Sequence, residues 1–271
     1  MDTSQAREKV REYWEERAKQ YYSSPGATTD DIHLRELEIA AIVQTLHALD
    51  LPAQASMLDV GCGDGHSTLG VAEALPDLHV LGIDYSQNMI RLADERLQRQ
   101  PELQERLSFL VGDVMNLRPV CADSLYDVVL TDRCLINLDS LESQYHAMAE
   151  IADHANRGGH YIAIENFVEG HENMNAARRA LGVPEIPVRW HNLYFREDDF
   201  IRGAERFFES IAIKDFASSY YFATRVIYSA MCQMRGEEPD YDHEIHRLAV
   251  HLPWVGQFSP IRMAVMRRKP Q

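Results

Sequence analysis

Short apolar runs alternate with helix-length segments from residue 56 onward, and this alternation is the strongest constraint on the fold. The expected strands are Met57–Val60, His79–Ile83, Leu107–Val111, Tyr126–Leu130 and His160–Ile164. The expected helices between them are His66–Leu75, Ser86–Gln100 and Leu141–Ala155. Strands joined by helices form right-handed crossovers, which produce a parallel sheet with helices on both faces. The alternation therefore predicts an α/β fold.

Further elements are expected before and after this region. Helical spacing of apolar residues predicts helices at 5–22 and from the polar cluster at 28–31 to about residue 49. Residues 167–195 are expected to be irregular, because they contain several glycines and prolines. The later expected elements are helix 196–206, strand 208–216, helices 218–235 and 240–252, and strand 261–267.

These elements predict a single domain with four parts. The parts are a helical lid (1–50), a core (51–216), an inserted helical cap (217–257) and a final strand (258–271). The chain has 271 residues, of which 45% are hydrophobic and 25% charged, so a core of ordinary size can form.

The charge balance and the cysteines restrict partners and location. With 27 Lys and Arg against 42 Asp and Glu, the net charge is −15, which disfavours a nucleic-acid partner. The sequence lacks an apolar stretch long enough to span a membrane and lacks a secretory signal at its start. Four scattered cysteines without a CxxC pair are typical of a reduced compartment. We expect a cytoplasmic protein with no membrane partner; the sequence leaves the oligomeric state open.

The most informative segment is the glycine-rich loop that follows the first expected strand. Gly61, Gly63 and Gly65 alternate there, which lets the backbone turn sharply and lets a ligand approach closely. Polar residues also follow the next three expected strands, namely Asp84, Gly112-Asp113 and Thr131-Asp132. Open α/β sheets bind ligands at the carboxyl ends of their strands, and an acidic residue at position 84 can accept both hydroxyls of a ribose.

The order of these features resembles the class I S-adenosylmethionine-dependent methyltransferases, most strongly over residues 56–135. The matching segments are Asp59-x-Gly61-x-Gly63-x-Gly65, Ile83-Asp84-Tyr85-Ser86-x-x-Met89, Gly112-Asp113, Asp127–Leu130 and the N-terminal Trp14-x-x-x-Ala18-x-x-Tyr21. The resemblance implies a Rossmann-like, seven-stranded, mostly parallel sheet with helices on both faces. Its last strand would be antiparallel beside the sixth.

The resemblance also implies S-adenosylmethionine as the cofactor, and it implies no metal. The glycine loop would face the methionine portion, Asp84 the ribose and Asp113 the adenine amine, with Tyr85 and Met89 flanking the adenine ring. The full implied cofactor set is Tyr21, Asp59, Gly61, Cys62, Gly63, Asp84, Tyr85, Met89, Gly112, Asp113, Val114 and Thr131.

Two alternatives remain at this point. An NAD(P)-dependent oxidoreductase would need a glycine at position 66 to complete GxGxxG, and His66 stands there. A non-catalytic nucleotide-binding module stays possible, because binding motifs do not prove turnover. For a methyltransferase, we expect an oxygen or nitrogen of a small metabolite or sugar-like molecule as the acceptor. The Asn-Pro-Pro-Tyr motif of DNA amino-methylases is absent after the fourth expected strand.

Three residues are candidates for catalysis, each with a structural alternative. His191 is a candidate general base or hydrogen-bond donor to the acceptor, or else a loop histidine bonded to backbone. Glu165 is expected to orient a hydroxyl or amine, or to cap a backbone turn. Arg133 is expected to hold a carboxylate of the acceptor, or to pair with Asp132 or Glu165.

Other clusters favour structural interpretations. An aromatic stripe is expected to be mostly core, with an acceptor platform as the alternative; it comprises Tyr220, Tyr221, Phe222, Arg225 and Tyr228. The residues Asp240, Asp242, His243, His246 and His251 are expected to form a solvated helix face rather than a metal site. Residues 169–172 are expected to be an exposed loop.

Overall fold

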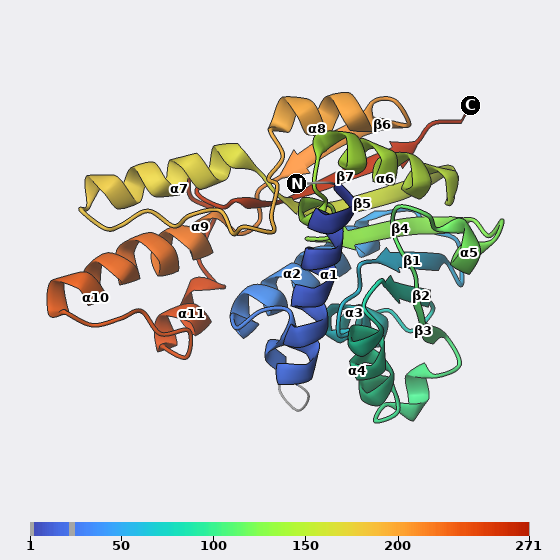
Figure 1. Ribbon diagram of the computed structural model, residues 1–271, viewed down its shortest axis with the longest axis horizontal. Helices are drawn as coiled ribbons and strands as arrows, with labels where there is room; N and C mark the ends of the chain where they lie inside the picture. The colour runs from blue at the N-terminus through green and yellow to red at the C-terminus, as the bar shows by residue number, and fades with distance from the viewer. Residues whose placement is uncertain (1–2, 22–24, 271) are drawn as a thin grey trace.

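The strands of this chain form one mixed sheet (Figure 1). The loops described below follow the carboxyl ends of its parallel strands. The computed structural model describes residues 3–21 and 25–270. Within them, the strand order is β3-β2-β1-β4-β5-β7-β6. The strands are β1 Ser56–Val60, β2 His79–Asp84, β3 Leu107–Val111, β4 Tyr126–Asp132, β5 Ala155–Asn166, β6 Phe208–Lys214 and β7 Ile261–Arg268. β1 to β5 are parallel, whereas β7 is antiparallel to β5 and β6. The predicted seven-stranded, mostly parallel sheet is confirmed.

Helices cover both faces of this sheet. The α-helices are α1 Thr3–Gln20, α2 Ile32–Ala48, α3 His66–Ala74, α4 Gln87–Leu97, α5 Arg118–Cys121, α6 Leu141–Asp153, α7 Val168–Ala180, α8 Glu197–Ala204, α9 Ser218–Tyr221, α10 Ser229–Arg235 and α11 Glu244–Ala249. Shorter helical turns are η1 Pro25–Ala27, η2 Pro101–Leu103 and η3 Leu135–Asn137, and η4 Phe222–Tyr228 is a π-helix between α9 and α10.

Successive residues of the central strands are buried on opposite faces. Met57 and Val128 lie in a core cluster with apolar residues of α2 and α3. Leu58 and Val129 lie in a second cluster with residues of α6 and α8. Because side chains alternate along a strand, a strand buried on both faces must be a continuous apolar run. This is why these strands could be recognised in the sequence.

Helix α7 corrects the expectation that 169–172 form an exposed loop and that residues 168–180 are irregular, whereas residues 181–194 form neither helix nor strand, as expected. Its buried residues are Gly170, His171, Met174, Asn175 and Arg178, which follow helical spacing but include only one large apolar side chain. Gly170 is a contact point rather than a turn, since a Cβ built there would lie 1.8 Å from the Ser259 carbonyl oxygen. A search for apolar periodicity therefore missed this helix.

Other predicted boundaries also shift. β5 is longer than expected at both ends, and β6 ends before Phe216 after a register shift between Glu209 and Ala212. Segment 218–235 is helical throughout, but it has a π-helical middle. The helix expected at 240–252 is limited to α11. The predicted ends at residues 22 and 271 lie outside the described residues.

The N-terminal helix α1 lies across the start of α4. The Glu15 carboxylate accepts hydrogen bonds from the backbone N–H groups of Gln87 (2.8 Å) and Asn88 (3.3 Å). These N–H groups belong to the first turn of α4 and have no partner within that helix. Glu15 thus caps α4 from α1. The placement agrees with the helical cover predicted for residues 1–50, whose role as a lid stays a prediction.

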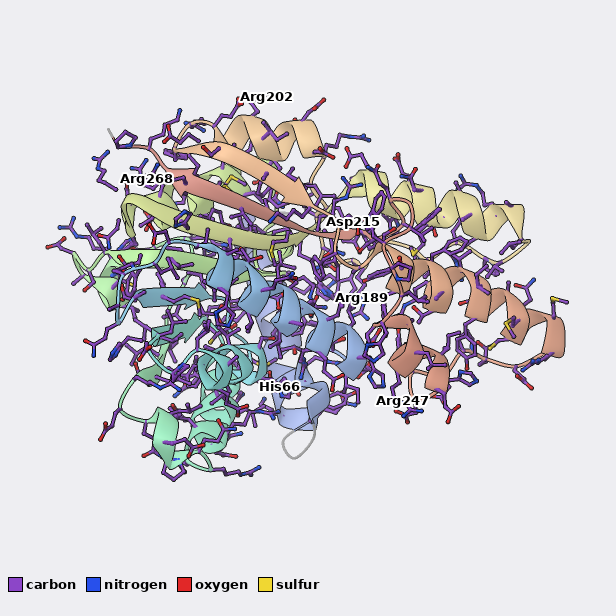
Figure 2. All side chains as sticks on the ribbon, turned by 180° about the vertical axis from the view of Figure 1, so that it is seen from behind. His66, Arg189, Arg202, Asp215, Arg247 and Arg268 are labelled. Atoms are coloured by element: carbon purple, nitrogen blue, oxygen red, sulfur yellow. The ribbon has the colours of Figure 1, made fainter. Side chains whose placement is uncertain are left out.

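Helices α7, α9, η4, α10 and α11 form a lobe beside the sheet, named here the helical lobe. Figure 1 shows it extending to one side of the sheet, and Figure 2 shows it from behind with Arg247 labelled on α11. The lobe is joined to the start of α2 through Asp31, which forms an ion pair with Arg225 and accepts a hydrogen bond from the Tyr220 hydroxyl (2.5 Å). Burial alone would raise the pKa of Asp31, but Arg225 and Tyr220 offset this effect and hold it below its usual value. None of the helices described is long and apolar enough to cross a membrane.

The close approach of α7 to the segment before β7 leads to a stability prediction. Gly170→Ala should lower the free energy of unfolding by about 1–3 kcal/mol, because the added methyl overlaps backbone at Ser259. Helix propensity alone predicts the opposite sign, since alanine favours a helix over glycine by roughly 1 kcal/mol. Urea denaturation distinguishes the two, with Glu172→Ala on the exposed face of α7 as the control. A variant more stable than the parent would contradict the packing described.

Candidate functional site

The turn after β1 is held against the end of β2 by backbone hydrogen bonds. The N–H groups of Gly61 (2.7 Å) and Cys62 (2.9 Å) both donate to the Ile83 carbonyl oxygen. The Gly63 N–H donates to the Asp84 carboxylate at 3.0 Å. Gly61 and Gly63 have φ values of +78° and +55°, in the left-handed region that favours glycine. The glycines expected from the sequence therefore build a tight turn beside Asp84.

Asp84 is the acidic group at the centre of this turn. Its Oδ1 accepts from the Ser86 N–H at 2.8 Å, and its Oδ2 accepts from Gly63. Burial raises the pKa of Asp84 to about 6, although the amides of Ser86 and Gly63 act in the opposite direction. Each carboxylate oxygen has lone pairs for a second hydrogen bond. Asp84 is therefore positioned to accept hydroxyl groups from a molecule in the adjacent cavity.

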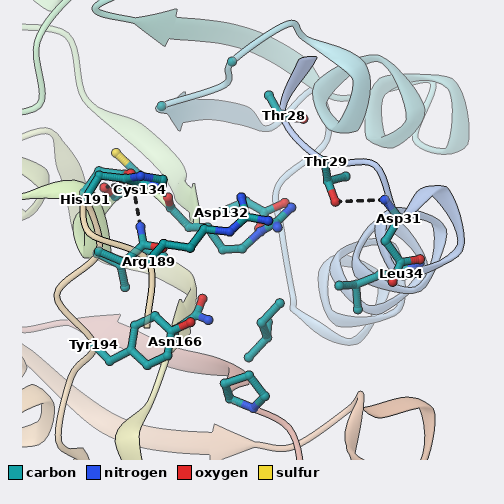
Figure 3. A pocket seen from close by; sticks show the side chains of 18 of the residues that line it. Thr28, Thr29, Asp31, Leu34, Asp132, Cys134, Asn166, Arg189, His191 and Tyr194 are labelled. Atoms are coloured by element: carbon teal, nitrogen blue, oxygen red, sulfur yellow. Dashed lines mark hydrogen bonds and ion pairs between the residues drawn. The ribbon is translucent and has the colours of Figure 1, made fainter. Parts of the chain in front are cut away.

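This cavity has a volume of about 410 Å³ and begins at the β1 and β2 turns. Gly61, Gly63, Asp84, Tyr85 and Met89 line its first end. The opposite end is lined by residues of β5, of the helical lobe and of the segment between α7 and α8, several of which Figure 3 shows. Volumes of roughly 300–1,000 Å³ are typical of small-molecule sites.

Seven residues of the implied cofactor set lie outside the lining of this cavity. They are Tyr21, Asp59, Cys62, Gly112, Asp113, Val114 and Thr131. Asp59 is buried, accepts from the Thr68 hydroxyl at 2.6 Å, and has its pKa raised by burial to about 7. Thr131 shares a hydrogen bond of 2.9 Å with the buried Tyr161 hydroxyl. Asp59 and Thr131 therefore bond to neighbouring elements of the fold, and their contact with a cofactor stays a prediction.

The remaining members of that set surround the turn. Tyr21 stacks under the Arg17 guanidinium and contacts the small cluster that contains Met89. Val114 is buried in the second core cluster. The Gly112 N–H donates to the Asp84 carbonyl oxygen at 3.0 Å, and Asp113 forms an ion pair of 3.1 Å with Arg7 of α1. The adenine role implied for Asp113 stays a prediction.

Two of the three catalytic candidates have structural partners. Glu165 is fully buried, and its two oxygens accept from the N–H groups of Leu135 (3.0 Å) and Ile136 (3.2 Å). It therefore caps η3 and does not line the cavity, and burial raises its pKa to about 8. Arg133 lines the cavity but forms an ion pair of 3.1 Å with the buried Glu38 of α2. Burial opposes the charge of Arg133, but Glu38 and Asp132 raise its pKa above the usual value.

His191 lines the cavity as expected, and it is 6% exposed. Its ring stacks on Tyr13 with centroids 4.5 Å apart, and Trp14 and Trp190 contact it edge-on. Burial, followed by the charges of Arg189 and Arg17, lowers the pKa of His191 to about 4. The imidazole is therefore neutral near pH 7.

Asn166, His171 and Tyr194 line the end far from Asp84, together with Arg189. Asn166 ends β5, and its position directly after an apolar strand predicted a cavity residue. The sequence interpretation missed His171. His171 could have been found only by recognising a helix whose buried face is polar. Tyr221 and Arg225 of the aromatic stripe also line the cavity, whereas Tyr220 and Tyr228 are buried side chains of the lobe.

The histidine and aspartate group near α11 is only partly a solvated face. His246 is 2% exposed and shares a hydrogen bond of 2.7 Å with the Tyr220 hydroxyl, which corrects the expectation for this residue. Asp240, Asp242, His243 and His251 are exposed. Within residues 3–21 and 25–270, no group of three or more His, Cys, Asp or Glu side chains could hold a metal ion.

Comparisons with known proteins agree with this geometry. A sequence profile described as a methyltransferase domain matches residues 57–159. Ajmaline N-methyltransferase of Rauvolfia serpentina is 28% identical over 172 residues, which are 62% of this chain and 56% of that protein. O-methyltransferase rstn1 of Aspergillus nomiae is 28% identical over 138 residues, which are 51% of this chain and 54% of that protein. Residues 57–159 therefore form a methyltransferase domain, and the chain is similar to S-adenosylmethionine-dependent methyltransferases.

The fold comparison extends over nearly the whole chain. The structure of magnesium protoporphyrin IX methyltransferase from Synechocystis PCC 6803 with bound S-adenosylhomocysteine has a TM-score of 0.61 and 17% identity to this chain. It covers 96% of this chain and 98% of its own. The alignments with the two curated relatives span about half the length of each. The antiparallel β7 also differs from the 3-2-1-4-5-6 sheet of dinucleotide-binding enzymes, and the oxidoreductase alternative is not retained.

The residues at the first end of the cavity fit S-adenosylmethionine, the cofactor of this family. Asp84 has free acceptor capacity for the ribose hydroxyls, and a Cβ at Gly61 would collide with Cys134 (2.5 Å from Sγ), so the turn leaves little room for a side chain. The buried Tyr85 hydroxyl has no hydrogen-bond partner among the described residues. The implied roles of Asp84 at the ribose and of Tyr85 and Met89 beside the adenine stay predictions.

The raised pKa of Asp84 makes cofactor affinity depend on pH. As pH falls through about 6, the carboxylate takes up a proton and loses its negative charge, so affinity for S-adenosylhomocysteine should fall. Asp84→Asn should weaken binding by about 1–3 kcal/mol at higher pH and should remove this dependence. Calorimetry from about pH 5 to about pH 8 measures both effects. The exposed Asp77→Asn should behave as the parent, and an unchanged affinity in Asp84→Asn would remove Asp84 from the site.

Proposed function

We propose that this chain transfers the methyl group of S-adenosylmethionine to an oxygen or nitrogen of a small-molecule acceptor. The observation that carries the proposal is the continuity of the cavity from Asp84 to Asn166, His171 and Tyr194. One end offers hydroxyl acceptors beside a glycine turn, and the other offers a wall of mixed apolar and polar side chains. The two relatives, an N- and an O-methyltransferase, support the same class of reaction.

The chemistry depends on alignment more than on a strong catalyst. Bound S-adenosylmethionine would supply an electrophilic sulfonium methyl: an acceptor lone pair would bond to the carbon, the carbon–sulfur electron pair would stay on sulfur, and the acceptor proton would leave to His191 or to water. The protein must hold donor and acceptor in line, about 3–3.5 Å apart. The cavity walls from α1, from the 188–194 segment and from the helical lobe would position the acceptor and exclude water.

We propose His191 as the group that accepts a hydrogen bond or a proton from the acceptor. Its Nδ1 is buried and has no hydrogen-bond partner among the described residues. A pKa of about 4 makes the imidazole a weak base that is neutral over the physiological range. It would therefore orient an acceptor hydroxyl or amine more effectively than it would ionise one. Arg133 and Glu165 are proposed as positioning residues for η3 and the end of β4.

Product analysis tests the proposed function. The protein is incubated with S-adenosylmethionine and pooled small metabolites, and mass spectrometry detects products heavier by one methylene group. We expect S-adenosylhomocysteine and methylated product in equal amounts, with turnover strongly reduced in Asp84→Asn. Tight cofactor binding without methylated product across such pools would favour the non-catalytic nucleotide-binding alternative.

A nuclear magnetic resonance titration tests the state of His191. Its folded pKa of about 4 lies below the ordinary 6.5, so an unfolded chain takes up a proton there before the folded one does. This site should therefore reduce stability progressively as pH falls from about 6.5 towards about 4. The ring signal of His191, assigned by its loss in His191→Gln, should stay that of neutral imidazole at about pH 5.5. A midpoint above about 6 would contradict the burial described.

A further inference from the structure

Six polar atoms on the wall of the cavity have no hydrogen-bond partner among the described residues. The Tyr85 hydroxyl lies at the cofactor end, and Asp132 Oδ1 and Arg133 Nε lie 3.5 Å apart in an ion pair. The other three atoms are Asn166 Oδ1, His171 Nδ1 and His191 Nδ1. The three residues are 6%, 8% and 6% exposed, so each is more than nine-tenths buried. An unsatisfied buried polar group costs about 1–3 kcal/mol. The convergence of three such atoms on one cavity indicates a ligand that completes their hydrogen bonds.

Two of these atoms, on Asn166 and His171, lie around Tyr194 at the end far from Asp84. The Asn166 amide lies beside Tyr194, and their interaction lowers the pKa of the tyrosine against the larger effect of burial (Figure 3). The rings of His171 and Tyr194 meet edge-to-face, with centroids 5.3 Å apart. Asn166 and His171 thus both neighbour Tyr194, although they come from a strand and a helix.

The hydrogen-bond network around His171 assigns its proton. Asn175 and Ile186 bond reciprocally, with Asn175 Nδ2 donating to the Ile186 oxygen (3.0 Å) and Ile186 N–H donating to Asn175 Oδ1 (2.9 Å). This pair fixes the orientation of the Asn175 amide, so the atom 3.2 Å from His171 Nε2 is the donor Nδ2. Nε2 therefore accepts. Burial lowers the pKa of His171, although a backbone hydrogen bond with Ile186 acts in the opposite direction, and the ring is neutral. In the tautomer that accepts at Nε2, the proton is on Nδ1.

The two unpartnered atoms are therefore complementary: Asn166 Oδ1 accepts and His171 Nδ1–H donates. A single hydroxyl can both donate and accept. We propose that Asn166 and His171 bind one hydroxyl group of the acceptor and select for an uncharged, hydroxylated ring compound. This proposal rests on the proposed function. The apolar side chains of Met174 and Ile186 line the same part of the cavity and would contact the ring.

The charges on the cavity wall favour an uncharged acceptor. Arg133 pairs with Glu38 and Asp132, and Arg225 pairs with Asp31. Asp30, which also lines the cavity, pairs with Arg17. Arg189 also lines the cavity, but the residue is exposed, and Figure 2 shows it between the sheet and the helical lobe. An exposed cation binds a carboxylate weakly because water screens it. Selection of an acidic acceptor by Arg189 is the alternative that the experiment must distinguish.

The binding experiment uses matched compounds on protein saturated with S-adenosylhomocysteine. Benzene, naphthalene and indole skeletons are each titrated unsubstituted, with a hydroxyl and with a carboxylate, by calorimetry. For the skeleton that binds best, the hydroxyl compound should bind about tenfold or more tightly than the other two. A carboxylate compound that binds as well or better, or the absence of any gain from the hydroxyl, would overturn the proposal.

Two substitutions at His171 separate recognition from a merely structural role. In His171→Asn the amide can occupy the position of Nδ1, whereas in His171→Gln it can occupy that of Nε2. We expect His171→Asn to retain the hydroxyl preference and His171→Gln to lose it about tenfold, with cofactor affinity unchanged in both. Asn166→Leu should lose the preference as well. If His171 acts only through Asn175, the order of the two His171 variants is reversed, and the proposal fails.

The outcome for the proposed function is read separately. Hydroxyl-selective binding without methylated product would leave this recognition pair in place and would contradict the methyl transfer alone. Methylated product without hydroxyl selectivity would support the methyl transfer and would contradict the recognition of a hydroxyl by Asn166 and His171.

Discussion

The site depends on two backbone amides, those of Gly61 and Cys62, that share the Ile83 carbonyl oxygen. These bonds fix the turn after β1 against the end of β2 and bring the Gly63 N–H to Asp84. The turn requires positive φ at Gly61 and Gly63, which residues with side chains rarely adopt. Tyr85 and Met89, which follow Asp84 in the sequence, line the cavity beside this turn. Helix α1 lies against the start of α4, where Glu15 accepts from the Gln87 N–H.

Two ion pairs with buried carboxylates connect the sheet to the acceptor end of the cavity. Arg133, directly after β4, is bound by Glu38 of α2, and Asp31 at the start of α2 is bound by Arg225 of the helical lobe. Helix α2 therefore links the sheet, through Glu38, with the helical lobe, through Asp31. The π-helix η4 carries Arg225, and such irregular turns are frequent at functional sites. The lobe thus forms part of the cavity wall rather than a separate unit beside it.

The cofactor end could be predicted from the sequence because its determinants are local. Gly61, Gly63 and Asp84 directly follow apolar strands, and their spacing alone defines the turn. The acceptor end could be predicted only in part: Asn166 and His191 line the cavity as their positions in the sequence indicated, whereas His171 depends on long-range contacts. His171 is buried through contacts of α7 with residues far along the chain, such as Gly170 against Ser259. Glu165 illustrates the same limit: its place after an apolar run suggested a cavity residue, but its oxygens are used by the amides of η3.

The central claim is that one cavity holds the cofactor against Asp84 and the acceptor against Asn166 and His171. A crystal structure with S-adenosylhomocysteine and a bound hydroxylated ring compound tests it most directly. The account predicts the ribose hydroxyls on the Asp84 carboxylate, and the acceptor hydroxyl between Asn166 Oδ1 and His171 Nδ1. A ribose bound away from Asp84 would contradict the account. A bound ring compound that contacts neither Asn166 Oδ1 nor His171 Nδ1 would contradict it as well.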